Sequence, residues 1–167
     1  MSERVGDDSG ELHLTHVSSA GSAQMVDIAD KSETDRLAVA EGVVTMASST
    51  VDLIVNGEIE KGEVFATARL AGITGAKKTS ELIPLCHQVP LTHISVDFRT
   101  DLKLGKVIIT ASARAFAKTG VEMEALTAVG VAALTMYDMC KAVDKGIRIG
   151  DIRLLEKHGG RGGSYRA

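Results

Sequence analysis

The chain has 167 residues, 44% of them hydrophobic, which is enough for one domain with a substantial core. A net charge of −3, with two tyrosines, three phenylalanines and no tryptophan, argues against a nucleic-acid-binding protein. The sequence shows no signal peptide or transmembrane run, and its two cysteines, Cys86 and Cys140, do not form a disulfide framework. We therefore expect a cytoplasmic protein whose partners include neither nucleic acid nor membrane.

The N-terminal stretch is polar and lacks hydrophobic periodicity, so residues 1–22 are expected to form a flexible tail. His13 and His16 lie in this tail and are expected to be solvated rather than bound to metal. A single catalytic domain is expected over residues 23–158, beginning with a short strand over residues 23–29.

Residues 34–47 fit either a strand or a helix, and the Val-Val-Thr run favours a strand. Three apolar side chains would then share one face of that strand: Leu37, Val39 and Val43. Ser49 and Asp52 have the spacing of a capping box, which predicts a short helix that ends near residues 56–57.

Residues 63–83 carry apolar side chains at helical spacing, and Gly72 and Gly75 are expected to interrupt this helix. Basic residues gather in and just before it: Lys61, Arg69, Lys77 and Lys78. These cations suit either a solvated surface or a wall that binds a phosphate-rich ligand. The phosphate-binding loop G-x-x-x-x-G-K-[ST] is absent from the sequence.

The segment PLCHQVP, residues 84–90, is predicted to be a stiff loop because a proline stands at each end. Cys86 and His87 are adjacent, so on an extended chain their side chains point in opposite directions. That geometry and the missing second ligand pair argue against a metal site and against a cysteine nucleophile with histidine as base. His87 remains either a hydrogen-bonding ligand for a substrate or a packed loop histidine.

Alternating apolar residues predict two strands, over residues 92–99 and 106–117, that form an antiparallel hairpin. Ile94, Val96 and Phe98 would share one face of the first strand. One face of the second strand would be lined by a longer set: Val107, Ile109, Ala111, Ala113 and Ala115.

Residues 118–145 are the most distinctive stretch, because residues 125–137 carry no charge. Such a run predicts a helix that is buried on most of its faces. Thr119 and Glu122 have capping-box spacing at its start.

Charged residues stand at both ends of this helix: Glu122 and Glu124 at the start, and Asp138, Lys141 and Lys145 at the end. They either complement the helix dipole or line a site. Glu124 and Asp138 are fourteen residues apart, which is ~21 Å along a helix and too far for one small substrate to contact both in one chain. A site that uses both ends therefore requires a folded-over entry segment or two subunits.

A last strand is predicted over residues 147–156, followed by a flexible, glycine-rich tail over residues 159–167. The order of the predicted elements is that of an α+β protein with a ferredoxin-like split β-α-β fold. Such a fold has an antiparallel sheet with helices on one face, and its other face is free to pack against a partner subunit in an oligomer.

Four motifs, taken together and in order, resemble the MoaC family, the cyclic pyranopterin monophosphate synthases of molybdenum cofactor (molybdopterin) biosynthesis. They are KGEVFATARLAGI at 61–73, LIPLCH at 82–87, KTGVEMEALTA at 118–128 and YDMCKAV at 137–143. The resemblance covers residues 14–163.

The resemblance implies a lyase that converts the 3′,8-cyclised dihydro-GTP made by a radical-SAM GTP cyclase into cyclic pyranopterin monophosphate and diphosphate. It further implies a homohexamer, a trimer of dimers, with each site between the subunits of a dimer. No redox cofactor is implied. Mg²⁺ could accompany the triphosphate of the substrate, and the sequence contains no dedicated metal site.

The resemblance also assigns residues to the site. By motif, the catalytic residues are Asp138, Lys141 and Lys61. The substrate-binding residues are Leu85, Cys86, His87, Glu122, Met123, Glu124, Arg36, Lys77 and Lys157.

This chemistry needs several proton transfers, which lysine can perform when neighbouring cations and burial lower its pKa. We expect Lys141, held by Asp138 and close to Lys145, to act as one general acid/base. Lys61 from a neighbouring subunit is expected to act as another. Two other interpretations remain. A non-catalytic nucleotide-binding oligomer is disfavoured by the paired Asp138 and Lys141, which a binding protein does not need. A metal-dependent hydrolase is disfavoured because the sequence lacks a cluster of metal ligands.

Overall fold

The computed structural model describes residues 21–160 and 162–167, so His13, His16 and most of the expected N-terminal tail lie outside the described residues. The helices are α1 (Ser48–Val55), α2 (Val64–Lys77), α3 (Thr79–Leu82) and α4 (Glu122–Cys140). The strands are β1 (Thr34–Thr45), β2 (Leu91–Asp101), β3 (Lys106–Ala117), β4 (Arg148–His158) and β5 (Tyr165–Arg166). None of these helices is long and apolar enough to cross a membrane.

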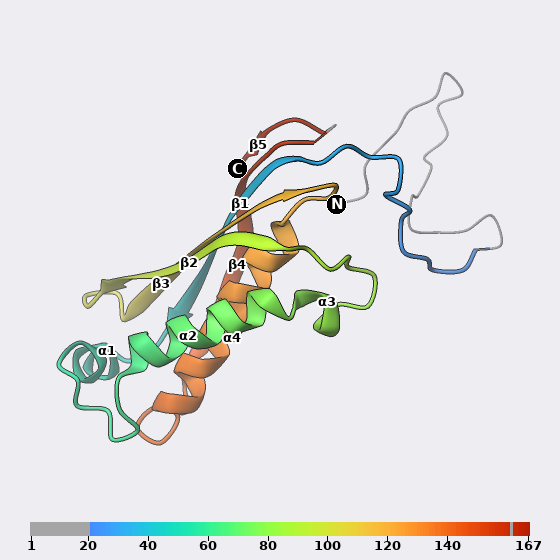
Figure 1. The fold of residues 1–167 in the computed structure, drawn as a ribbon. Coiled ribbons are helices and arrows are strands. Elements are labelled where there is room, and N and C mark those ends of the chain that lie inside the picture. Colours follow the sequence, from blue (N-terminus) through green and yellow to red (C-terminus); the bar gives the residue numbers. More distant parts are fainter. Residues whose placement is uncertain (1–20, 161) are drawn as a thin grey trace.

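The strands form one sheet in the order β2-β3-β1-β4-β5, and every pairing is antiparallel (Figure 1). Strand β3 lies between β1 and β2, which α1, α2 and α3 separate in sequence. Strand β1 lies between β3 and β4, which α4 separates. The predicted α+β class, the antiparallel sheet and the β2–β3 hairpin are therefore confirmed.

Side chains alternate between a buried and a more open face along β1. Ala38, Ala40 and Val44 are fully buried. The other face carries the apolar side chains of Leu37, Val39 and Val43, which are only partly buried. The prediction of a shared face for that set is confirmed, and it is the face that the helices leave open. The helix-covered face of β1 and β3 is rich in alanine, which lets α4 approach the sheet closely.

Helices α2 and α4 lie side by side against the sheet (Figure 1). The predicted interruption at Gly72 and Gly75 is wrong, because α2 continues through both glycines. A Cβ on Gly72 would lie 2.8 Å from the carbonyl oxygen of Ala128, and one on Gly75 would lie 2.7 Å from Val131 Cγ2. The absence of side chains lets α2 pack closely on α4, and this packing offsets the low helix propensity of glycine.

The predicted strand over residues 23–29 is wrong. This segment has only an isolated bridge at Ala23, and two of its carbonyl oxygens contact side chains. His87 Nε2 contacts the carbonyl oxygen of Val26 at 2.7 Å, and Lys118 Nζ donates to that of Ala29 at 2.7 Å. By contrast, β5 falls in the stretch assigned to a flexible tail and was not predicted; it pairs with the end of β4.

Both capping boxes are wrong although both helices form. The N-cap of α1 is Ala47, whose N–H donates to the carboxylate of Asp144, a residue that is distant in sequence. The N-cap of α4 is Val121, and the Glu122 carboxylate pairs with Lys157 instead of returning to the backbone. Tertiary partners have replaced the local bonds that the spacing predicted.

Candidate active site

The C-terminal end of α4 carries three charged side chains that contact one another: Asp138, Lys61 and Lys141. We call them the lysine–aspartate group. Lys141 Nζ lies 2.6 Å from Asp138 Oδ1, and Lys61 Nζ lies 3.0 Å from Asp138 Oδ2. Lys61 Nζ also donates to the Asp138 carbonyl oxygen at 2.8 Å. One carboxylate thus holds two ammonium groups on one surface.

Sequence and chain path explain this geometry. Asp138 and Lys141 are three residues apart at the end of a helix and therefore share one face. Lys61 comes from the turn between α1 and α2, where Gly62 has a φ of 102°, a value that favours glycine. The expectation that Lys61 reaches this group from a neighbouring subunit is therefore wrong, because Lys61 meets Asp138 within one chain.

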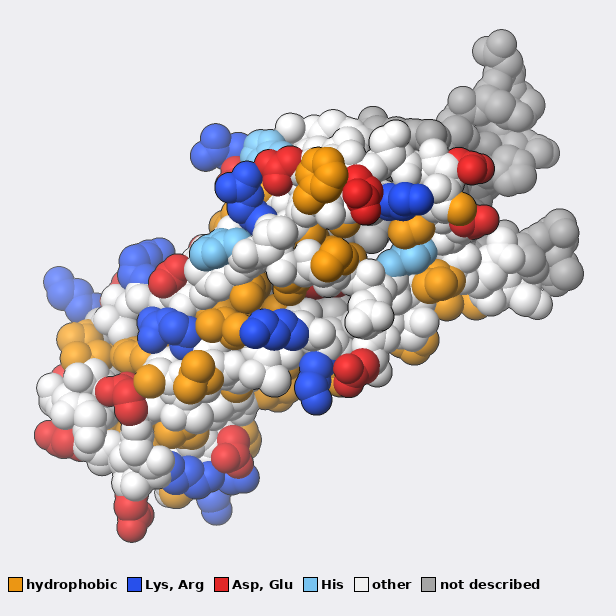
Figure 2. Space-filling model, in the orientation of Figure 1, with side chains coloured by type: hydrophobic (Ala, Val, Ile, Leu, Met, Phe, Trp, Pro, Cys, Tyr) orange, Lys and Arg blue, Asp and Glu red, His pale blue; other side chains and the backbone are white. Residues whose placement is uncertain are grey.

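The two lysines hold the Asp138 carboxylate ionised. Hydrogen bonds from Lys141 and Lys61, with their charges, lower the pKa of Asp138 to about 2. The Asp138 carboxylate in turn raises the pKa of Lys141 above its ordinary value. The expected fall in the Lys141 pKa is therefore wrong for the single chain, because the attached carboxylate dominates. Figure 2 shows basic and acidic side chains meeting where α4 ends, at the lower end of the molecule.

The N-terminal end of α4 carries a second set, which we call the glutamate group: Glu122, Glu124, Cys86 and Lys157. The Glu122 carboxylate pairs with Lys157 Nζ at 3.1 Å. Glu124 is only 4% exposed and makes no ion pair with any described residue. Its burial raises its pKa to about 7, its own backbone N–H partly offsets that rise, and the charge of Glu122 adds to it.

Cys86 joins this group from the proline-bounded loop, where His87 follows it in sequence. Burial, and then the nearby Glu124 carboxylate, raise the pKa of the Cys86 thiol, so the structure favours an inert thiol. His87 contacts the backbone of the segment before β1. Leu85 is half-buried in the same loop, and Met123 is 37% exposed at the start of α4.

Arg36 is buried and braces the entry to α4. Its Nε donates to the Ala117 carbonyl oxygen at 3.2 Å, and Nη2 donates to that of Lys118 at 3.3 Å. Its guanidinium packs against Gly160 so closely that a Cβ at that position would overlap it. Lys77 is exposed at the end of α2 and makes no ion pair within the described part of the chain.

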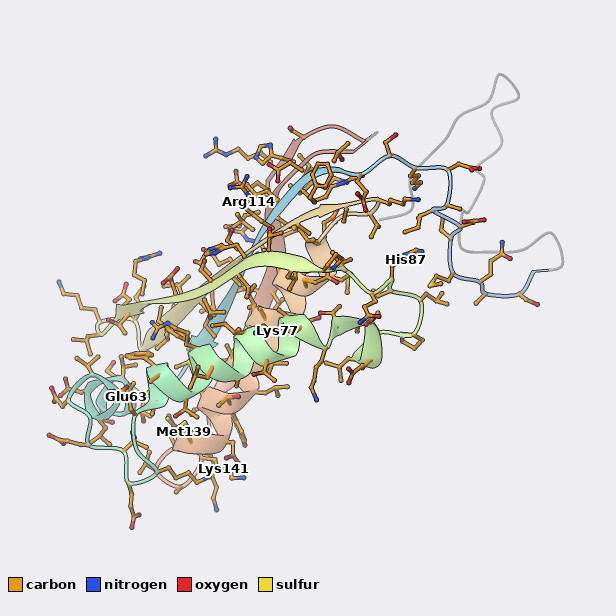
Figure 3. All side chains as sticks on the ribbon, in the orientation of Figure 1. Glu63, Lys77, His87, Arg114, Met139 and Lys141 are labelled. Atoms are coloured by element: carbon orange, nitrogen blue, oxygen red, sulfur yellow. The ribbon has the colours of Figure 1, made fainter. Side chains whose placement is uncertain are left out.

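The twelve predicted residues therefore do not form one cluster in one chain. Figure 3 shows Lys141 at one end of the helical layer, His87 at the other, and Lys77 on α2 between them. Since α4 runs from Glu122 to Cys140, the fourteen-residue separation of Glu124 and Asp138 corresponds to ~21 Å of helix. The prediction that both residues lie on one continuous helix is confirmed.

Residues 21–160 and 162–167 contain no group of three His, Cys, Asp or Glu side chains that could hold a metal ion. A hollow of about 320 Å³ lies on the sheet where the pairing of β1 with β4 shifts register, lined by Glu41, Val43, Asp151, Ile152 and Arg153. None of these residues belongs to the lysine–aspartate group or the glutamate group. The chemistry-bearing side chains lie at the ends of α4 instead.

The sequence model of the MoaC family matches residues 25–160. The chain belongs to the MoaC family. The cyclic pyranopterin monophosphate synthases of Rhodospirillum rubrum and Dinoroseobacter shibae are each 54% identical to it over 154 residues. Those alignments cover 92% of this chain and 93% and 98% of the two relatives. The synthase of Clostridium perfringens is 53% identical over 152 residues, covering 91% of this chain and 96% of the relative.

Membership of the MoaC family confirms the resemblance inferred from the four motifs. One residue beside the lysine–aspartate group, Asp144, was not predicted from the sequence. Its carboxylate accepts bonds from Ala47 N, Thr50 Oγ1 and Gly146 N. The only local signal is an aspartate two residues before a glycine, which is typical of a turn and gives no hint of the contact with α1.

Proposed function

We propose that this chain is a cyclic pyranopterin monophosphate synthase, a lyase of molybdenum cofactor biosynthesis. Its substrate would be 3′,8-cyclised dihydro-GTP, and its products cyclic pyranopterin monophosphate and diphosphate. The observation that carries the proposal is the identity of 53 to 54% with three synthases over more than nine-tenths of the chain. The upstream partner would be a radical-SAM GTP cyclase, and the working compartment the cytoplasm.

The lysine–aspartate group suits the phosphate end of this substrate. Two ammonium groups on one carboxylate leave a net positive charge for a triphosphate, and they stabilise charge as diphosphate departs. Because its pKa is raised, Lys141 is protonated near neutral pH and would donate a proton or bind the anion. Asp138 would keep the two amines close together despite their mutual repulsion. We assign Mg²⁺, where it is required, to the triphosphate rather than to protein ligands.

The glutamate group suits the ring end of the substrate. Glu122 and Glu124 are acceptors for the N–H groups of a guanine-derived ring, and His87 and Cys86 would add contacts from the loop. Leu85 and Met123 would supply apolar surface. Further site positions would be Arg36, Lys77 and Lys157.

We further propose that the site is composite, with the two groups contributed by different subunits of a homohexamer. The ~21 Å between the ends of α4 supports this arrangement, because one small nucleotide cannot contact both. The strand order β2-β3-β1-β4 supports a ferredoxin-like fold, in which the open sheet face is available for a partner subunit.

The activity is tested by incubating the purified protein with enzymatically made 3′,8-cyclised dihydro-GTP and following diphosphate and pterin together. We expect both products in a one-to-one ratio. A folded oligomer that binds the nucleotide but forms neither product would contradict the synthase and favour a nucleotide-binding protein.

The composite site is tested by mixing inactive variants. Lys141→Ala subunits mixed with Glu124→Ala subunits should recover activity, because some sites then combine an intact lysine–aspartate group with an intact glutamate group. Lys61→Ala mixed with Lys141→Ala should not recover, since both lysines meet the same Asp138. Recovery in the second mixture alone would contradict the arrangement.

A further inference from the structure

Asp144 lies in the turn that follows α4, and its carboxylate joins two elements that are remote in sequence. Oδ2 accepts from Ala47 N at 2.9 Å and from Thr50 Oγ1 at 3.2 Å, both at the start of α1. Oδ1 accepts from Gly146 N at 2.8 Å. One side chain thus closes its own turn and caps the first turn of α1.

The two joined elements are those that carry the two lysines. Lys141 precedes Asp144 by three residues, and the N–H groups of Val143 and Asp144 both donate to the carbonyl oxygen of Cys140 at 3.0 Å. The path from Lys141 to Asp144 is therefore a compact turn. On the other side, α1 leads through a short turn to Lys61, which binds the carbonyl and carboxylate of Asp138.

The pKa shifts of Asp144 and Cys140 are consistent with this contact between the turn after α4 and the start of α1. The bond from Ala47 has the largest effect on the pKa of Asp144 and lowers it; burial opposes this, and the bonds from Gly146 and Thr50 lower the pKa further, so the carboxylate stays ionised. Buried Cys140 lies within reach of both charges: Asp144 adds to the burial that raises its thiol pKa, whereas Lys61 lowers it. Asp144 and Lys61 therefore lie near the same thiol at the end of α4.

We propose that Asp144 is a positioning residue that sets the separation of Lys61 and Lys141 by tying the turn after α4 to the start of α1. The inference rests on the proposed function, because it assigns Asp144 a role in holding the triphosphate-binding lysines. Asp144 itself is engaged by Ala47, Thr50 and Gly146 and acts through the two lysines.

The first test compares Asp144→Ala with Asp144→Asn and with the control Asp52→Ala. The control removes from α1 an exposed carboxylate that makes no hydrogen bond or ion pair with the residues that the structure describes. We expect Asp144→Ala to lower kcat about 10- to 100-fold, because a displacement of about 1 Å can cost that much. Asp144→Asn keeps one acceptor oxygen and should retain more activity, whereas Asp52→Ala should match the parent.

A second test separates positioning from general stability. Pyrophosphate affinity is measured by calorimetry for Asp144→Ala in the parent and in a Lys61→Ala background. A positioning role predicts weaker binding in the parent and no further loss when Lys61 is absent. Equal losses in both backgrounds would overturn the proposal. If Asp144→Ala does not fold, Thr50→Val removes one of the three bonds, and unchanged pyrophosphate affinity in that variant would overturn it too.

The failures of the two proposals are distinguishable. Full turnover by Lys141→Ala would overturn the proposed function of the lysine–aspartate group. Inactive Lys141→Ala together with fully active Asp144→Ala would overturn only the positioning role.

Discussion

At the C-terminal end of α4, Asp138 is exposed and lies between two lysine amines; at the N-terminal end, Glu124 is buried and lacks an ion pair within the described residues. The first carboxylate has a pKa of about 2 and the second a pKa of about 7. Neighbouring charge dominates at the exposed end, and burial dominates at the other. Near neutral pH the Asp138 carboxylate therefore stays ionised, whereas Glu124 is able to gain or lose a proton.

The largest expected effect comes from breaking the fixed-charge end. Lys141→Ala should lower turnover by a factor of at least about 1,000, equivalent to ~4 kcal/mol of barrier, because a cation at the departing diphosphate is lost. The measurement is the rate of diphosphate release at saturating substrate. Lys103→Ala, in the exposed β2–β3 turn, is the matched control and should retain parental activity.

Glu124, at the N-terminal end of α4, should make the free energy of unfolding depend on pH. The folded-state pKa of Glu124 lies above its value of 4.5 in an unfolded chain, so the folded protein keeps a proton that the unfolded chain has released. Stability should therefore fall as pH rises from about 4.5 to about 7, and the loss should then level off, at a total on the order of 3 kcal/mol.

Glu124→Gln should remove this dependence. Urea titrations of parent and variant at pH 5, 6, 7 and 8, at one subunit concentration, isolate the contribution of Glu124 as the difference between the two curves. Glu81→Gln, on the exposed surface of α3, is the control. Parallel curves for parent and Glu124→Gln would show that the carboxyl does not titrate in this range.

The separation of the two ends depends on the packing of α4 against α2. Gly72→Ala should destabilise the protein by about 1–3 kcal/mol, because its Cβ meets backbone rather than a movable side chain. Gly130→Ala, on α4 itself, meets nothing within 4 Å and should stabilise by about 0.5–1 kcal/mol. Urea unfolding of both variants checks the contrast, and equal effects would argue against close packing at Gly72.

The smallest expected effect is on the free energy of unfolding, when the Lys157–Glu122 pair or the Lys141–Asp138 pair is removed. Lys157→Met leaves the half-buried Glu122 without its lysine and should cost about 1 kcal/mol. Lys141→Met should cost less, because exposed Asp138 keeps Lys61. Urea unfolding of both variants measures the two losses of stability. A larger loss for Lys141→Met than for Lys157→Met would contradict the view that the lysine–aspartate group serves binding rather than folding.

Local pattern was enough for much of the fold. Period-two alternation predicted the β2–β3 hairpin, an uncharged run predicted buried α4, and a three-residue spacing predicted the Asp138–Lys141 pair. Each depends on residues close in sequence, whose geometry the backbone repeat sets. The four motifs predicted the family in the same way.

Long-range contacts decided the rest. Lys61 meets Asp138 across 77 positions and Asp144 caps α1 across 97, and no local spacing records either contact. In sequence, Gly72 is typical of a helix break, and only its packing against α4 explains why the helix continues. Glu124 is typical of a solvated residue in sequence, and only the fold shows that it is buried. The sequence by itself determined the α+β class, the β2–β3 hairpin, the buried helix α4 and the family to which the chain belongs. Only the tertiary structure decided which charges are paired and which are buried, because pairing and burial depend on neighbours that the fold supplies.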